Sequence, residues 1–318
     1  MRCLCCGEVI DDNSSKELET KWHDRCVKEF FGTTVLPGLA IDKKRLEKMI
    51  AINVGEGLTI PGVQKKFSLY LEKESPARLT LVDYPTGYIM KPQASEYENL
   101  PEYEWLAMMI AKEAGIKVVP FSLYDTGDEL AYITRRVDRR FESDKILRFA
   151  MEDFCQLAER LAEDKYKGSY EACVRIIRMY SDNPGLDVSE LFLRVVVSFV
   201  VGNSDLHLKN FSLREKEAGK RRFGLSEAYD VLPVNVVEPL DLDEMALSLN
   251  GKKRELELED FLEFADYCKI GRVAGKKIIQ KICEKRDRFV ELVMNAPLGN
   301  LQKEKMKELV VGRCDKLE

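Results

Sequence analysis

The segment that most constrains the fold is residues 189–201, which is strongly apolar. A helix of this composition must be buried on most of its sides, so it belongs inside a larger helical part of the chain. It stops at Gly202-Asn203, because glycine commonly follows the last residue of a helix. The other elements expected in this half are helices at residues 152–161, 169–180 and from 256 to the C-terminus, and short strands at 211–214 and 222–224.

The first half of the chain has shorter, strand-like patterns. Residues 66–72 alternate between apolar and polar side chains, and residues 87–90 form a second short apolar run. The other elements expected here are a weak helix at 43–50, a helix at 102–114, and a hairpin formed by 118–124 and 129–134. Because a strand-rich part precedes a helix-rich part, we predict an α+β fold with two lobes and a cleft between them.

Charge and apolar content exclude two classes of partner. Charged residues make up 33% of the chain with both signs interspersed, and the net charge is -5, so we expect no direct binding to nucleic acid. No run approaches the roughly 20 apolar residues of a membrane span, so we expect a cytoplasmic protein that does not bind a membrane. Its nine cysteines, an odd number, are then expected to be reduced.

The loop that follows the apolar helix, residues 202–211, carries many polar side chains between a buried helix and a strand. A phosphoryl-transfer site needs an aspartate that accepts the proton of the attacking hydroxyl and a nearby asparagine that binds magnesium. Asp205 and Asn210 have this spacing, and His207 and Lys209 lie in the same loop.

A second carboxylate ligand for the metal is required, and Asp230 follows after a two-strand excursion that would return the chain to the same place. The alternative is that Asp205 and Asp230 only cap turns, as many aspartates do. Taken together, the polar residues favour a kinase centre.

A cation must also hold the ATP phosphates, and Lys91 at the end of a predicted strand fits this role. Glu104 on the following helix is a candidate to pair with it, and Glu102 is the competing choice. A lysine at a strand end is otherwise an ordinary solvated charge. The glycine-rich stretch 55–66 precedes the first strand, but it matches no standard phosphate-loop spacing.

The N-terminal segment contains Cys3-x2-Cys6 and His23-x2-Cys26. Two close pairs of sulfur and nitrogen ligands are typical of a structural zinc site in a segment too short for its own core. Cys5 is an alternative ligand to Cys3 or Cys6, and the other interpretation is that these are incidental thiols beside a surface histidine. We favour a closed, non-catalytic zinc site.

The chain resembles the HipA family of bacterial toxin kinases, and in particular its shorter HipT-like branch, in several short motifs and in the order in which they occur. The resemblance covers about residues 55–318. It rests on Gly62-Val63-Gln64-Lys65-Lys66, Ile89-Met90-Lys91-Pro92, Leu100-Pro101-Glu102-Tyr103-Glu104, Arg135-Arg136-Val137-Asp138-Arg139, Glu152-Asp153-Phe154, residues 202–211 and Ala228-Tyr229-Asp230-Val231-Leu232.

This resemblance implies a two-lobed, protein-kinase-like fold with a small strand-rich N-lobe and a large helical C-lobe. The expected domains are a zinc-binding module at 1–32, the N-lobe at 33–148 and the C-lobe at 149–318. The roles implied are Asp205 as catalytic base, Asn210 and Asp230 as Mg²⁺ ligands, Lys91 and Glu104 at the ATP phosphates, His207 and Lys209 completing the catalytic loop, and residues 133–137, with Thr134, Arg135 and Val137, as the adenine-binding hinge.

The family also implies partners. Its members phosphorylate a serine of an aminoacyl-tRNA synthetase, are restrained by a DNA-binding HipB-like antitoxin, and autophosphorylate in the glycine-rich loop. Here Thr59 is the candidate for autophosphorylation, and Pro61 stands where HipT-like proteins carry a second serine. The chain lacks the full N-terminal subdomain of longer HipA proteins, which implies a small HipS-like antitoxin as a further partner. A small-molecule phosphotransferase and a non-catalytic module of a repressor complex are the alternative functions.

Overall fold

The computed structural model describes residues 1–40, 66–73, 76–80, 86–142 and 145–318. The chain divides into two compact units, Met1–Trp105 with Pro120–Ile146, and Leu106–Val119 with Leu147–Glu318. The expected helix at 43–50, nearly all of the glycine-rich stretch and Thr59 lie outside the described residues.

The first unit is built on a six-stranded sheet with the strand order β1-β3-β2-β4-β6-β5. All neighbouring pairs are antiparallel except β1 and β3, which are parallel. The strands are β1 (Gly38–Leu39), β2 (Phe67–Glu72), β3 (Arg78–Thr80), β4 (Tyr88–Lys91), β5 (Phe121–Asp125) and β6 (Leu130–Arg135), and β7 (Arg139–Glu142) pairs separately with β8 (Lys145–Arg148). The predicted hairpin is therefore confirmed as β5 and β6.

Two short helices, α1 (Ser15–Thr20) and α2 (Asp24–Phe31), belong to this unit, as does the first part of α4 (Leu100–Glu113). The fully buried Trp22 packs its ring against Phe30 and Phe31 of α2, and both of these rings contact Tyr88 of β4. This aromatic cluster gives the N-terminal segment an apolar attachment to the sheet.

The second unit is mainly helical. Its helices are α5 (Phe154–Leu157), α6 (Tyr170–Tyr180), α7 (Pro184–Val201), α8 (Val234–Val237), α9 (Leu258–Tyr267), α10 (Arg272–Cys283), α11 (Arg286–Asn295) and α12 (Asn300–Leu317), with 3₁₀ turns at Ala162–Asp164 and Leu208–Asn210. A three-stranded antiparallel sheet has the order β11-β10-β9 and consists of β9 (Met151–Asp153), β10 (Ser212–Glu215) and β11 (Phe223–Leu225).

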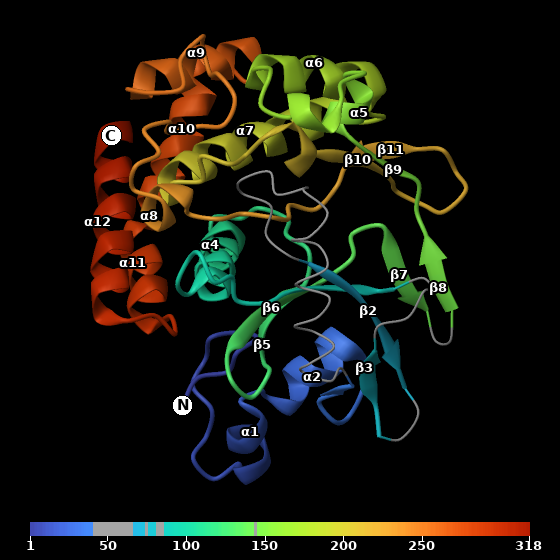
Figure 1. Ribbon diagram of the computed structural model, residues 1–318. Helices are drawn as coiled ribbons and strands as arrows, with labels where there is room; N and C mark the ends of the chain where they lie inside the picture. The colour runs from blue at the N-terminus through green and yellow to red at the C-terminus, as the bar shows by residue number, and fades with distance from the viewer. Residues whose placement is uncertain (41–65, 74–75, 81–85, 143–144) are drawn as a thin grey trace. The chain divides into compact units, whose positions relative to one another are not determined.

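The apolar helix α7 forms the core of this unit, as its sequence predicts. All residues from Val195 to Val201 are buried, and α7 packs against α6 and α12 (Figure 1). The helix begins with Pro184 in its first turn and ends at Gly202, which has a left-handed φ of 73°. A side chain at Gly202 would also meet Leu309 of α12, so both backbone and space favour glycine there.

The helix expected at 152–161 is wrong for most of its length. Met151–Asp153 is a strand that pairs with β10, and only Phe154–Leu157 is helical. The side chain of Asp153 accepts a hydrogen bond from the backbone N–H of Gln156 and caps this short helix. The strand pairing, which joins segments far apart in sequence, therefore overrides the local helical pattern.

None of the helices in the part of the chain that the structure describes combines the length and apolar character needed to cross a membrane.

Candidate active site

The loop after α7 places Asp205 at the surface of the second unit. The turn at Gly202 ends the helix, and the backbone N–H of Asp205 donates to the side chain of Asn203 at 3.2 Å. The carboxylate is 37% exposed and accepts a hydrogen bond from the hydroxyl of Tyr166 at 2.5 Å. A partly exposed carboxylate that already accepts an O–H group has the chemistry required of a general base.

His207 is buried close to the carboxylate of Asp205. Its side chain is buried, and its Nε2 atom is 3.9 Å from Oδ1 of Asp205. Burial lowers the pKa of His207 to about 4, and the positive charge of Lys165 acts in the same direction. The imidazole is therefore neutral at neutral pH, and its ring packs edge-to-face with the ring of Tyr166, with the centroids 5.2 Å apart.

Asn210 and Asp230 lie together, although 20 positions separate them in sequence. The side-chain Nδ2 of Asn210 donates to Oδ2 of Asp230 at 3.3 Å, and Oδ1 of Asn210 accepts from the backbone N–H of His207 at 2.9 Å. Asp230 has a φ of 63°, a left-handed conformation that is uncommon outside glycine and often occurs at functional sites. Asn210 carries an amide oxygen and Asp230 a carboxylate, and both are ligand types that Mg²⁺ prefers.

Lys209 holds the loop to the neighbouring strand. Its ammonium is 2.7 Å from Asp153 at the end of β9, and its carbonyl accepts from the hydroxyl of Tyr229 at 3.2 Å. That hydroxyl is also 2.6 Å from the hydroxyl of Ser212 on β10. These contacts make Lys209 a positioning residue for the loop.

In the first unit, Lys91 pairs with Glu104. The ammonium lies 2.7 Å from Oε1 of Glu104, and the side chains are only 8% and 1% exposed. Lys91 is therefore not a solvated strand-end charge, and the choice that the sequence leaves open between two glutamates is resolved toward Glu104. Glu102 is also buried, and this burial raises the pKa of its carboxyl group.

The segment expected to form the hinge begins in the last residues of β6 and continues into the following turn, and two of its side chains are bonded within the first unit. The hydroxyl of Thr134 donates to the carbonyl of Pro120 at 2.9 Å. The guanidinium of Arg135 donates from Nε to the carbonyl of Phe30 at 2.7 Å and from Nη2 to that of Glu29 at 2.7 Å. Val137 follows two residues later, in the turn between β6 and β7.

The four residues of the expected zinc site are close together. One ligand atom from each of Cys3, Cys6, His23 and Cys26 lies within 4.8 Å of all the others. Cys5, the alternative ligand, is outside this group among the described residues. Tetrahedral Zn²⁺ with bonds of about 2.0–2.3 Å fits such a set of three sulfurs and one nitrogen.

Tyr166 is the site residue that sequence reasoning missed. Its hydroxyl contacts Asp205, and the partial loss of hydration around this hydroxyl, together with the charge of the carboxylate, raises the pKa of Tyr166 above its usual range, although the residue is 42% exposed overall. The loop between Asp164 and Tyr170 has no motif that distinguishes Tyr166 from other surface tyrosines, so no sequence signal indicated this contact.

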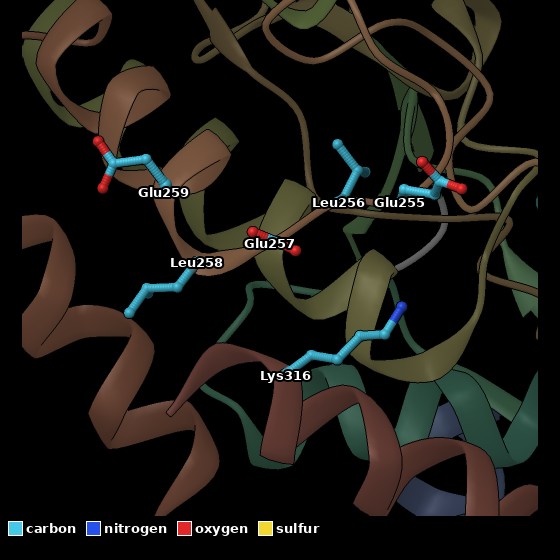
Figure 2. A pocket seen from close by; sticks show the side chains of 6 residues that line it. All are labelled: Glu255, Leu256, Glu257, Leu258, Glu259 and Lys316. Atoms are coloured by element: carbon cyan, nitrogen blue, oxygen red, sulfur yellow. The ribbon is translucent and has the colours of Figure 1, made fainter.

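A separate hollow of about 700 Å³ lies in the second unit, where the chain enters α9 near the end of α12 (Figure 2). It is lined by Glu255, Leu256, Glu257, Leu258, Glu259 and Lys316. None of the candidate catalytic residues lines it, so its size alone does not make it the active site.

Comparisons with known proteins identify the family and the fold. A family model described as HipA-like C-terminal domain matches residues 58–290. Three curated relatives are "Putative kinase Y4mE" of Sinorhizobium fredii, 26% identical over 80% of this chain, "Putative kinase Y4dM" of the same organism, 29% identical over 73%, and "Putative kinase" of Haemophilus influenzae, 25% identical over 74%. The matches span 61%, 58% and 75% of these relatives, so the chain spans less than two thirds of both Sinorhizobium proteins.

Two solved structures share the fold. HipA of Shewanella oneidensis, solved in a toxin–antitoxin complex with HipB and operator DNA, matches with a TM-score of 0.73 and 18% identity over 86% of this chain and 70% of its own. The Helicobacter pylori proinflammatory kinase CtkA matches with a TM-score of 0.53 and 17% identity over 75% of this chain and 90% of its own. At these identities the likeness concerns the fold.

Proposed function

This chain belongs to the HipA-like C-terminal domain family, and we propose that it is an ATP- and magnesium-dependent protein serine/threonine kinase. The observation that carries the proposal is the contact between Nδ2 of Asn210 and Oδ2 of Asp230 at 3.3 Å. These residues belong to the same unit as Asp205, whose carboxylate is partly exposed. The names of the relatives, which describe kinases, support the same reaction class.

Asp205 is the proposed general base. It accepts the proton of the acceptor hydroxyl as that oxygen forms a bond to the γ-phosphorus and the bond from this phosphorus to ADP breaks. The hydrogen bond that its carboxylate accepts from Tyr166 supports this role, because the donor is already a hydroxyl group. His207 is neutral beside it and supplies no competing positive charge.

Asn210 and Asp230 are the proposed ligands of Mg²⁺, which neutralises charge on the phosphate oxygens when it is bound. The left-handed backbone of Asp230 and the hydrogen bond from the N–H of His207 to Asn210 support fixed positions for both side chains. Lys209 positions the loop through Asp153.

In the first unit we propose that Lys91 holds the ATP phosphates. Its buried pair with Glu104 supports this role, since the carboxylate directs an otherwise flexible ammonium. The segment 133–137 is the proposed adenine-binding hinge, with Thr134 and Arg135 fixed by their own hydrogen bonds.

The biological role that we propose is that of a toxin in a HipA- or HipT-like toxin–antitoxin system. Its acceptor is a component of translation such as an aminoacyl-tRNA synthetase, and its partners are a HipB-like antitoxin and a small HipS-like antitoxin. The Shewanella complex, in which HipA is bound with HipB and operator DNA, supports the first partner. Autophosphorylation at Thr59 is part of this proposal. So is the division of the chain into a zinc module at 1–32, an N-lobe at 33–148 and a C-lobe at 149–318.

A related phosphotransferase acting on a small molecule would use the same base and metal ligands, and a non-catalytic module would use neither. Incubation of the full chain with γ-labelled ATP, Mg²⁺ and a cell extract separates these functions. We expect labelled protein that is lost when Mg²⁺ is omitted. Label found only in small metabolites would favour the small-molecule enzyme, and no transfer to any acceptor would contradict the kinase proposal.

A further inference from the structure

The Cys/His cluster has the surroundings of a metal site. Nδ1 of His23 faces the sulfurs of Cys6 and Cys26 at 3.3 Å and 4.0 Å, and its Nε2 is 3.2 Å from the carbonyl of Val9. A ligating histidine commonly donates its other ring N–H to such an acceptor, which fixes the ring and its tautomer. The backbone N–H of His23 also points at the sulfur of Cys3 at 3.4 Å.

The local backbone brings these ligands together from two elements. Cys3 and Cys6 lie in one tight turn, which is closed by the hydrogen bond from the N–H of Gly7, with a φ of 75°, to the carbonyl of Cys3 at 2.9 Å. His23 is the residue before α2, and Cys26 lies in the first turn of that helix. A bound metal would therefore fasten the start of α2 to the N-terminal turn.

The C-terminal end of α2 is hydrogen-bonded to two strands of the sheet, β4 and β6. The carbonyl of Phe30 accepts hydrogen bonds from Arg135 at the end of β6, at 2.7 Å, and from the hydroxyl of Tyr88 on β4, at 3.3 Å. The ring of Phe30 also lies under the guanidinium of Arg135, 5.7 Å from its centroid. A cation is favoured here because the last carbonyls of a helix carry partial negative charge.

These strands carry the residues proposed to hold ATP. β4 ends at Lys91, which lies opposite Tyr132 of β6, and the last residues of β6 form the first part of the proposed hinge. The N-terminal turn is bonded to the sheet as well, since the carbonyl of Leu4 accepts from the N–H of Leu123 at 3.1 Å and from the hydroxyl of Ser122 at 3.1 Å on β5.

We infer that Cys3, Cys6, His23 and Cys26 bind a structural Zn²⁺ ion, and that through α2 and Arg135 this ion fixes the strands that carry Lys91 and the hinge. The ion itself does not touch ATP. The part of the inference that concerns ATP rests on the proposed function, whereas the part that concerns the metal does not.

The experiment compares the purified full-length chain with three variants. Cys6→Ser removes a ligand, Cys5→Ser is the matched control in the neighbouring position, and Arg135→Gln leaves the metal site intact but removes the cation that joins α2 to β6. Zinc per chain is measured by plasma mass spectrometry, thermal unfolding by circular dichroism, and ATP·Mg²⁺ affinity by calorimetry. The wild-type chain is also stripped with a zinc-selective chelator, which keeps the test independent of whether Cys6→Ser folds.

We expect about one zinc per chain in the wild type, Cys5→Ser and Arg135→Gln, in keeping with a four-ligand structural site. We expect loss of zinc in Cys6→Ser, and a several-fold weaker ATP affinity in both Arg135→Gln and the stripped chain. A wild type without zinc, or zinc lost in Cys5→Ser and kept in Cys6→Ser, would overturn the ligand assignment. Wild-type ATP affinity in the stripped chain and in Arg135→Gln would overturn the coupling. Absence of ATP binding in the zinc-loaded wild type would instead count against the kinase proposal.

Discussion

The hydroxyl of Tyr166 donates to Oδ1 of Asp205 at 2.5 Å, which is the hydrogen bond that an acceptor hydroxyl needs to make with a general base. In the proposed kinase the tyrosine and the acceptor therefore compete for one carboxylate oxygen. Tyr166→Phe removes the hydroxyl and keeps the ring that packs on His207. We expect a lower KM for a protein acceptor with kcat nearly unchanged, measured by steady-state transfer of labelled phosphate. A lower kcat with unchanged KM would instead mean that Tyr166 assists the chemical step.

The Lys91–Glu104 pair is expected to couple stability with ATP binding. Lys91→Met leaves a buried carboxylate without its cation, which typically costs about 3–5 kcal/mol, and Glu104→Gln leaves the cation without its carboxylate. We expect both single variants to lose ATP affinity, and the double variant to be destabilised by less than the sum of the two. Urea unfolding and calorimetry measure these effects, and Glu102→Gln is the matched control that should bind ATP normally. Additive losses of stability would show that the two side chains do not interact.

The pH dependence of stability should include a contribution from His207. Its pKa is lowered to about 4 in the folded chain from an ordinary value of 6.5. The unfolded chain therefore binds a proton first as pH falls. The contribution is fully present above pH 6.5 and is lost as pH falls toward 4, and its size is on the order of 3 kcal/mol.

NMR titration measures this pKa directly, because the chain contains only two histidines. His207→Gln identifies the signal, and this variant should lose less stability than the wild type between pH 7 and pH 4.5 in urea unfolding. A His207 signal that titrates near 6.5 would contradict the burial of this side chain.

Gly202 is expected to resist substitution. Alanine there would have to adopt a φ of 73° and would place its Cβ 2.9 Å from a methyl group of Leu309. We expect Gly202→Ala to lower the free energy of unfolding by about 1–3 kcal/mol. Gly312→Ala, within α12, should instead be neutral or stabilising, because the new Cβ would meet no described atom within 4 Å beyond its chain neighbours and the backbone of its own helix. Equal effects in thermal unfolding would contradict the role of Gly202 as a helix end.

Apolar patterns and turn residues in the sequence predicted the helices and the hairpin that form between residues close together in the chain. The apolar run of α7, the helix expected at 169–180, which is α6, and the β5–β6 hairpin could all be predicted from neighbouring residues. The pairing of β9 with β10 could not, because Asp153 meets Ser212 only in the folded chain.

The candidate site also contains contacts within one loop and contacts between segments that are far apart in sequence. The spacing of Asp205 and Asn210 is visible in the sequence because one loop holds both residues. The contact of Tyr166 with Asp205 joins two loops, and the contact of Arg135 with α2 spans more than 100 positions. Such contacts depend on how the chain packs, so no local spacing indicates them.

The central claim is that Asp205 acts as the base in phosphate transfer. The most direct measurement compares wild type and Asp205→Ala for transfer of γ-labelled phosphate and, in parallel, for ATP·Mg²⁺ affinity. A general base contributes about a hundredfold to ten-thousandfold to the rate, so we predict a loss of transfer of this size with nearly unchanged ATP affinity. Transfer at the wild-type rate by Asp205→Ala would contradict the account.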